Sequence, residues 1–234
     1  MLQLDHLTLA APGFRLTANL TVPKGARTAL IGPSGAGKST LLNAIAGFFP
    51  PQSGRILWQG QDITAQDPGQ RPVTILFQDQ NLFPHLTLER NLALGLASDG
   101  SLSPDIRARV EEALRRTGLD GLAQRKPAQL SGGQQGRAAL ARALLRARPL
   151  LLLDEPFAAL GPALKQDMLA LVAEVAAQTG ATVLMVTHDP QDATRFADLT
   201  VLVADGLAHP PQDTAALFAD PPKALADYLG QSGS

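Results

Sequence analysis

The chain has 234 residues, and its 20 Lys and Arg nearly balance 21 Asp and Glu, so a net charge of -1 gives no cationic field that would bind nucleic acid. Hydrophobic residues make up 45% and charged residues 18% of the chain, which excludes general disorder and favours one large α/β domain. It has no cysteine, no apolar run long enough to cross a bilayer and no signal-peptide pattern, so we expect it to stay in the cytoplasm without disulfides or thiolate metal sites.

The first part of the chain is expected to form strands followed by a loop and a helix. Apolar and polar residues alternate after a Pro-Gly turn, which predicts an antiparallel pair over residues 2–22. Thr28–Ile31 is an apolar run and a predicted buried strand, and a helix is expected over residues 41–47. Between them lies a glycine-rich loop made of Gly32, Pro33, Ser34, Gly35, Ala36, Gly37, Lys38, Ser39 and Thr40.

Strand, glycine-rich loop and helix, in this order, are what a phosphate-binding loop requires. Successive backbone N–H groups of such a loop point into one concavity, and the helix N-terminus adds its positive dipole end. Lys38 can then reach the outer phosphates of a nucleoside triphosphate, and the Ser39 hydroxyl is a ligand for Mg²⁺. The alternative is a glycine-rich turn that fits the pattern by chance, and the flanking strand and helix favour phosphate binding.

A helical segment follows two further strands. Residues 55–58 and 72–77 are predicted strands, and the second ends at Gln78. Residues 88–96 and 106–116 then show helical spacing, which predicts an insertion between strands. The expected division is a single domain at residues 1–234, with a nucleotide-binding core at 1–78 and 146–234 and a mostly helical insertion at 79–145.

The last helix of this insertion begins with a second glycine-containing motif, formed by Ser131, Gly132, Gly133 and Gln134. Ser131 is well placed as the helix N-cap, and the two glycines permit close approach to the backbone. The motif is either a simple cap or the face of a second anion site. Two glycines would weaken a helix with nothing in front of it, which favours the anion site.

Two carboxylates follow the next buried strand. Four leucines at residues 150–153 predict a central strand of a parallel sheet, and Asp154 and Glu155 come where it ends. Ligands bind at this edge of open α/β sheets. Asp154 is a candidate ligand for Mg²⁺, and Glu155 is a candidate base for an attacking water. The alternative is a pair of solvated acidic residues.

A second buried strand ends at a histidine. A helix is predicted to start at Pro162 and end at Gly180, and an apolar strand over residues 181–186 follows it. His188 then reaches the same sheet edge as Glu155 if the two strands are parallel neighbours. A structural histidine and a sensor of the terminal phosphate both remain open. A further strand and short helices are expected to complete the chain.

Together, these features resemble the ATP-binding cassette ATPases of membrane transporters. The phosphate loop, Gln78, the Ser131–Gln134 motif, the Asp154-Glu155 pair and His188 occur in that family's order over nearly the whole chain. The resemblance implies an α/β fold with a P-loop NTPase core and a mostly parallel sheet. It also implies an N-terminal antiparallel β subdomain and an inserted α-helical subdomain.

The resemblance further implies a role for each site residue with ATP and Mg²⁺. Ser39, Gln78 and Asp154 would serve Mg²⁺ and its waters. Glu155 would polarise the attacking water, and His188 would hold the γ-phosphate and that water in line.

The same resemblance implies several partners. A head-to-tail homodimer would sandwich two ATP molecules, with Ser131 to Gln134 of one copy facing the phosphates bound by the other. The helical insertion, entered through Gln78, would grip transmembrane permease subunits at the cytoplasmic face of the inner membrane. A periplasmic or extracellular solute-binding protein would act indirectly, and no nucleic acid would be involved.

A narrower pattern resembles the ATPases of bacterial thiamine importers. It comprises residues 71–78, 81–87, 94–96 and 203–206. ATPases of iron, sulfate, molybdate or polyamine importers are the alternatives within transport, because this subunit does not touch the cargo. A cassette ATPase without a membrane partner is the alternative outside it.

Two departures from the family pattern bear on function. No aromatic residue stands near Ala10 and Ala11, where the family stacks adenine, and Phe14 is a weak substitute, so weaker base affinity is expected. Residues 158–161 read Ala-Ala-Leu-Gly instead of Ser-Ala-Leu-Asp. Gly161 therefore predicts hydrolysis with altered coupling between the two sites of the dimer.

Overall fold

The computed structural model describes residues 1–77, 81–158 and 160–230, and within them the sheet has 11 strands. The strands are β1 (Leu2–Ala11), β2 (Phe14–Val22), β3 (Arg27–Ile31), β4 (Ser53–Trp58), β5 (Gln61–Asp62), β6 (Val73–Leu76), β7 (Leu150–Asp154), β8 (Thr182–Val186), β9 (Leu199–Ala204), β10 (Leu207–Ala208) and β11 (Gln212–Asp213). The helices are α1 (Lys38–Ala46), α2 (Leu88–Ala93), α3 (Pro104–Arg116), α4 (Gly132–Leu145), α5 (Pro162–Thr179), α6 (Pro190–Phe196), α7 (Thr214–Ala219) and α8 (Lys223–Tyr228), with a 3-10 turn η1 at Pro127–Gln129.

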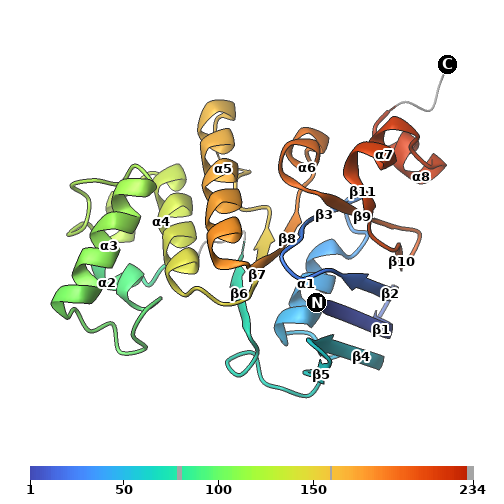
Figure 1. Ribbon diagram of the computed structural model, residues 1–234, viewed down its shortest axis with the longest axis horizontal. Coiled ribbons are helices and arrows are strands. Elements are labelled where there is room, and N and C mark those ends of the chain that lie inside the picture. Colours follow the sequence, from blue (N-terminus) through green and yellow to red (C-terminus); the bar gives the residue numbers. More distant parts are fainter. Residues whose placement is uncertain (78–80, 159, 231–234) are drawn as a thin grey trace.

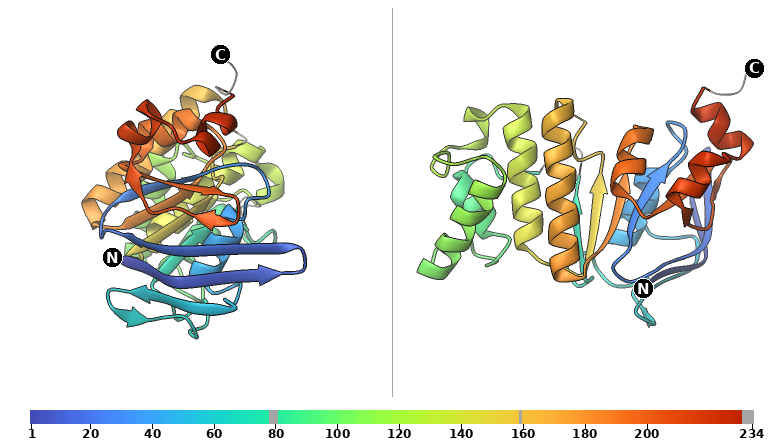
Figure 2. Two further views of the ribbon diagram at one scale, coloured as in Figure 1. Left: turned by 90° about the vertical axis from the view of Figure 1, so that its right-hand side faces the viewer. Right: turned by 45° about the horizontal axis from the view of Figure 1, so that its top comes forward.

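The sheet has an antiparallel part and a parallel part. Its strand order is β5-β4-β1-β2-β10-β9-β3-β8-β7-β6, and β11 pairs with β9. β1 pairs antiparallel with β2 and β4, and Figure 2 shows these three strands side by side at one end of the molecule. Parallel pairs join β9, β3, β8, β7 and β6. The predicted fold class, a mostly parallel P-loop core with an N-terminal antiparallel layer, is confirmed.

Strand β7 lies between β8 and the edge strand β6, one place from the centre of the parallel part where the sequence predicted it, and it is buried on both faces. Its four leucines are at most 5% exposed, because helices cover both faces of the parallel sheet. Leu150 and Leu152 belong to the buried cluster that includes α1 and the antiparallel strands. Leu151 and Leu153 belong to the cluster that includes α5 and α6 on the other face. This alternation follows from the period of two along a strand and joins both cores at the strand that ends in Asp154.

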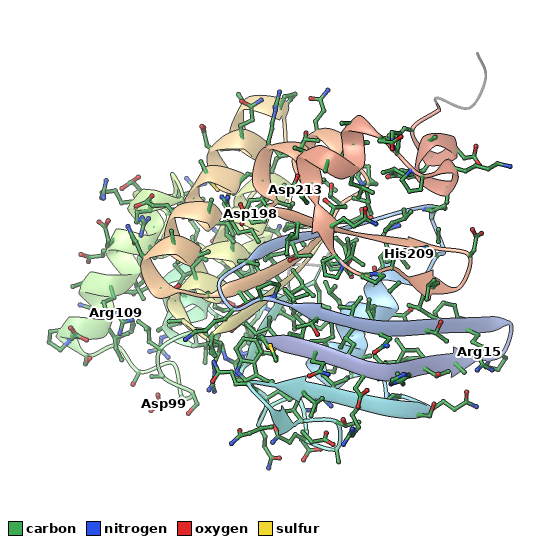
Figure 3. All side chains as sticks on the ribbon, turned by 45° about the vertical axis from the view of Figure 1, so that its right-hand side comes forward. Arg15, Asp99, Arg109, Asp198, His209 and Asp213 are labelled. Atoms are coloured by element: carbon green, nitrogen blue, oxygen red, sulfur yellow. The ribbon has the colours of Figure 1, made fainter. Side chains whose placement is uncertain are left out.

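Helices α2, α3 and α4 pack together at the end of the molecule away from the antiparallel strands (Figure 1). Figure 3 places Asp99 and Arg109 at this end and Arg15 of β2 at the opposite end. Their shared core contains Leu88, Leu92, Ala93, Val110, Leu114, Leu119, Leu130, Ala138 and Ala141. Across the described ranges, no helix is long and apolar enough to span a bilayer. The limits 79 and 145 of the insertion stay a prediction.

A buried arginine binds the end of α1, the helix that follows the phosphate loop. Arg71 is 2% exposed, and its guanidinium donates hydrogen bonds to the carbonyls of Ala44 at 2.8 Å and Ile45 at 2.9 Å. It also donates to the carbonyls of Gln66 at 3.0 Å and Thr64 at 2.7 Å. The last carbonyls of a helix lack helical partners and carry partial negative charge, so a cation there stabilises the helix.

Candidate active site

A cavity of about 530 Å³ lies where β3, β7 and β8 end. Because these strands are parallel neighbours, the residues that follow them meet at one edge of the sheet, as predicted. The cavity is lined by Phe14, Gly32, Ser34, Gly35, Gly37, Lys38, Ser39, Thr40, Glu155, His188 and Tyr228. The phosphate loop, the glutamate and the histidine therefore share one cavity.

Two glycines of the phosphate loop have a backbone conformation with positive φ, and both lie so close to neighbouring atoms that a side chain would not fit. Gly37 has φ of 100° and is the N-cap of α1, and a Cβ there would lie 2.7 Å from the Phe14 ring. Gly32 has φ of 145°, and a Cβ there would overlap the carbonyl oxygen of Val203. The loop is thus packed directly against β9 and against Phe14. The Phe14 ring lies against the loop and lines the cavity, and Phe14 pairs with Ala11, one of the two alanines near which the family has its base-stacking residue.

The Lys38 ammonium rests on carbonyl oxygens of its own loop. The side chain is 8% exposed, and Nζ donates to the carbonyls of Gly32 at 2.7 Å and Pro33 at 2.8 Å. Burial lowers the pKa of Lys38, while the nearby carboxylates of Glu155 and Asp154 act in the opposite direction. The cation has neutral hydrogen-bond partners and lies beside the N-terminus of α1, so an anionic ligand such as phosphate fits the cavity.

A hydroxyl and a carboxylate meet beside the loop. Ser39 Oγ donates to Asp154 Oδ1 at 2.9 Å, and Asp154 is 8% exposed. Burial raises the pKa of Asp154; the Ser39 hydrogen bond opposes this rise, whereas the nearby Glu155 adds to it. The Ser39 hydroxyl and the Asp154 carboxylate are hard oxygen ligands, and the carboxylate has no direct cationic partner among the described residues, so the pair suits Mg²⁺. In the described part of the chain, no group of three or more His, Cys, Asp or Glu side chains could hold a metal.

Glu155 and His188 contact each other at the cavity. His188 Nδ1 lies 3.2 Å from Glu155 Oε2. The backbone of Glu155 has φ of 46°, and its N–H donates to the carbonyl of Val186 at 3.2 Å. A left-handed backbone at a residue other than glycine costs roughly 1 kcal/mol or more and persists where the surroundings over-determine it. The carboxylate is thus held close to the imidazole by both backbone and side-chain contacts.

Two residues that the sequence analysis missed hold the segment around His188. Lys165 of α5 donates to Asp189 Oδ2 at 2.7 Å and pairs with Asp192 at 3.0 Å. Tyr228, the last residue of α8, donates its hydroxyl to the carbonyl of His188 at 2.7 Å. Neither contact has a local signal in the sequence, because each depends on how distant helices dock onto the sheet.

The Ser131–Gln134 motif contributes no lining residue to the cavity of its own chain, as far as the described residues show. Ser131 is the N-cap of α4, as predicted, and its Oγ accepts from the N–H of Gln134 at 3.3 Å. Gln134 Oε1 accepts from the N–H of Ser131 at 2.9 Å, which completes a capping box. A Cβ on Gly133 would lie 3.1 Å from Leu160, so the motif adjoins the segment before α5. The predicted ligand Gln78 lies outside the described residues.

A larger groove of about 870 Å³ is lined by residues of β6 and α4, among others. Phe48 and Phe83 line it and are 55% and 46% exposed. Arg142 of α4 places its guanidinium 5.7 Å from the centre of the Phe83 ring, and its Nη2 donates to the carbonyl of Asn81 at 2.7 Å. Its Nη1 is buried and has no hydrogen-bond partner among the described residues. Arg146 and Arg148 also line the groove, which therefore combines exposed aromatic rings with positive charge.

Known proteins share this sequence and fold. A profile of the family described as ABC transporter matches residues 16–158. The chain is 67% identical over 230 residues to a protein named thiamine import ATP-binding protein ThiQ from Cereibacter sphaeroides, a match that covers 98% of this chain and 100% of that protein. A protein of the same name from Ruegeria sp. is 56% identical, with 98% and 100% covered. The dimeric ATP-binding cassette MJ0796, solved in a post-hydrolysis state bound to ADP and Pi, has a TM-score of 0.82 and 32% identity, with 92% of this chain and 99% of that chain covered.

Proposed function

The chain belongs to the ABC transporter family, and we propose that it is the ATP-hydrolysing subunit of a thiamine importer. One observation carries the ATPase assignment: the phosphate loop shares a cavity with a glutamate and a histidine that are 3.2 Å apart. The choice of thiamine is supported by relatives named for thiamine import, at 67% and 56% identity over 98% of the chain.

ATP binding uses groups that already face the cavity. Lys38 pairs with the outer phosphate oxygens, and the N–H groups at the start of α1 and in the loop donate to the remaining ones. Ser39 and Asp154 would hold Mg²⁺, which would supply positive charge to neutralise the phosphates. Phe14 offers an aromatic wall to the base. Gln78 is proposed as a further ligand of Mg²⁺ because it follows β6 in the sequence.

Hydrolysis depends on Glu155 and His188, which line the same cavity as the phosphate loop. Glu155 orients the attacking water and takes its proton, because a carboxylate at a sheet edge beside the phosphates is within reach of that water. His188 contacts the same carboxylate and holds the terminal phosphate and water in line. Most of the rate enhancement in phosphoryl transfer comes from such positioning and from charge stabilisation.

A second copy completes each site. The Ser131–Gln134 motif caps α4 and contributes no lining residue to the cavity of its own chain, and the positive dipole end of this helix suits the phosphates bound by a partner copy. The solved cassette MJ0796 is described as dimeric. We therefore infer a head-to-tail homodimer that closes on ATP and opens after hydrolysis.

The groove beside α4 is the proposed seat of the transmembrane permease. Its exposed Phe48 and Phe83 rings suit an apolar helix face, and the arginines that line it suit acidic side chains of a partner. A cytoplasmic loop of the permease that fills this groove would couple the nucleotide site to the membrane. The subunit then sits peripherally at the cytoplasmic face of the inner membrane, and a solute-binding protein delivers thiamine on the other side.

The first experiment tests hydrolysis. ATP turnover is measured for the wild type, for Glu155→Gln and for Glu111→Gln, an exposed glutamate on α3 that serves as a matched control. We expect Glu155→Gln to lower turnover by about 100-fold or more and to accumulate ATP-bound dimer on size exclusion, while Glu111→Gln behaves as the wild type. Equal turnover in all three proteins would reject Glu155 as the base.

The second experiment tests the cargo. The chain is expressed with the permease encoded beside it, and the purified complex is reconstituted in liposomes with the matching solute-binding protein. We expect ATP-dependent uptake of labelled thiamine that unlabelled thiamine inhibits and Glu155→Gln abolishes. Uptake of iron, sulfate, molybdate or a polyamine in its place would overturn the thiamine assignment. Failure to co-purify with any permease would overturn the transport assignment.

A further inference from the structure

The C-terminal helix α8 contributes a side chain to the cavity. Tyr228 lines it together with Glu155 and His188, and its ring packs against the buried cluster that includes α5 and α6. Its hydroxyl donates to the backbone carbonyl of His188 at 2.7 Å. The segment that carries the histidine is therefore joined to the end of the last described helix.

The peptide that follows His188 is held at both of its polar groups. Its carbonyl accepts from Tyr228, and its N–H, which belongs to Asp189, donates to Oγ1 of Thr187 at 3.1 Å. Asp189 is the N-cap of α6 and also accepts from Lys165 at 2.7 Å. The N–H side of this peptide is thus held by Thr187 and, through Asp189 and Lys165, by α6 and α5, whereas the carbonyl side is held by Tyr228 of α8.

The hydroxyl of Tyr228 has the protonation state that this contact requires. Burial raises the pKa of Tyr228, and the negative charges of Glu155 and Asp189 raise it further. The phenol therefore stays protonated at neutral pH and donates its proton to the carbonyl. A phenylalanine at this position would keep the ring packing and remove only the donor.

We propose that Tyr228 is a positioning residue for hydrolysis, because its hydroxyl fixes the peptide that carries His188 and so keeps the imidazole beside Glu155. The proposal rests on the proposed function, in which those two side chains order the attacking water. Its consequence is that α8 belongs to the catalytic apparatus. Loss of the hydroxyl leaves His188 attached through Thr187 and Asp189 but less precisely oriented.

The test compares steady-state ATP turnover of full-length wild type and Tyr228→Phe. Removing one hydrogen bond of this kind is expected to lower kcat by about threefold to tenfold. KM for ATP and the thermal midpoint should stay unchanged, because the ring is retained and the hydroxyl touches the histidine backbone. An unchanged kcat would overturn the proposal, and so would a loss that appears only in KM.

Leu229→Ala is the matched control. Leu229 follows Tyr228 and packs against the same buried cluster, and its side chain has no polar group to offer His188. We expect this variant to lower the thermal midpoint while kcat at 25 °C stays close to the wild-type value. An equal fall of kcat in both variants would assign the effect to the packing of α8 and overturn the specific role of the hydroxyl.

Glu155→Gln, assayed in parallel, separates this proposal from the proposed function. If the wild type hydrolyses ATP and Glu155→Gln does not, the ATPase assignment stands, and an unchanged Tyr228→Phe contradicts the positioning role alone. A wild-type complex without turnover would contradict both.

Discussion

Arg71 is predicted to stabilise the nucleotide-binding core through the end of α1. Its guanidinium donates four hydrogen bonds to backbone carbonyls, two of them in the last turn of that helix, and the side chain is 2% exposed. Arg71→Ala removes a donor from two buried carbonyls of α1 and from the part-buried carbonyls of Thr64 and Gln66. The carbonyl of Ala44 keeps the hydrogen bond from the N–H of Gly47 at 3.1 Å, so the carbonyl of Ile45 loses most.

The expected loss follows from the energetics of buried acceptors. Each unsatisfied buried group costs about 1–3 kcal/mol, but the costs are not additive, and removal of the guanidinium also removes its own desolvation penalty. We expect Arg71→Ala to lower the free energy of unfolding by about 3–5 kcal/mol. Arg71→Lys keeps the charge, yet one ammonium cannot reproduce the planar fork, so a loss of about 2 kcal/mol is expected.

Urea denaturation followed by the fluorescence of Trp58, the single tryptophan of the chain, measures these losses. Trp58 is 5% exposed and belongs to the buried cluster that contains α1, so it reports on this part of the core. Arg55→Ala is the control, because Arg55 is 60% exposed and pairs with Asp5 at the surface. Its urea midpoint should match the wild type. A loss below about 1 kcal/mol in Arg71→Ala would refute the reasoning.

Three further predictions address the loop, the metal site and α5. Because burial raises the pKa of Asp154, the folded chain binds this proton more tightly than the unfolded chain, and the ionised carboxylate destabilises the fold at pH 7. Asp154→Asn should therefore raise the urea midpoint of the nucleotide-free protein and abolish Mg²⁺-dependent turnover. The increase in urea midpoint should shrink as the pH falls through the pKa of Asp154 in the folded chain. A variant with a lower urea midpoint than the wild type at pH 7 would contradict this stability argument. Gly32→Ala places a Cβ on the carbonyl oxygen of Val203 and should cost about 2–4 kcal/mol of unfolding free energy in the same assay, whereas a loss below about 1 kcal/mol would show that β9 gives way. Gly161→Asp should raise the free energy of unfolding by about 0.5 kcal/mol, because Gly161 is the N-cap of α5 and has room for a side chain that accepts hydrogen bonds. Unchanged ATPase cooperativity and transport in this variant would reject the predicted role of position 161 in coupling.

Elements with strong local signals were predictable from the sequence. α5 begins at Pro162 and is capped by Gly180 in a left-handed conformation, because both residues act on the backbone whatever surrounds them. Ser131 caps α4 for the same kind of reason. Helix α2 ends at Ala93, earlier than the apolar spacing over residues 88–96 indicated, since periodicity reports which face is buried and does not mark a helix end.

Irregular backbone escaped prediction. β1 shifts register between Leu4 and Leu7, and His6 within that interval has φ of 48°. Glu155 has φ of 46° directly after β7. Histidine adopts this conformation more often than most residues, but glutamate does not, so the fold imposes the strain at Glu155 and no propensity pattern marks it.

The candidate site was partly predictable for a similar reason. Residues that end neighbouring parallel strands must meet, which places Glu155 beside His188 once β7 and β8 are paired. Lys165 and Tyr228 come from helices whose docking no local pattern specifies, so their contacts became visible only in the folded chain. The metal and nucleotide roles of individual residues stay predictions, and Gln78 lies outside the described residues.

The resting place of the Lys38 ammonium has a consequence for the nucleotide cycle. Its two hydrogen bonds to Gly32 and Pro33 mean that ATP competes with the loop itself for the cation, so the measured affinity is a difference between two sets of contacts. When the phosphates depart, the same carbonyls recapture the ammonium, and no buried charge is stranded. The two carbonyls thereby stabilise the nucleotide-free loop, and this stabilisation is subtracted from the free energy that Lys38 gains by binding phosphate.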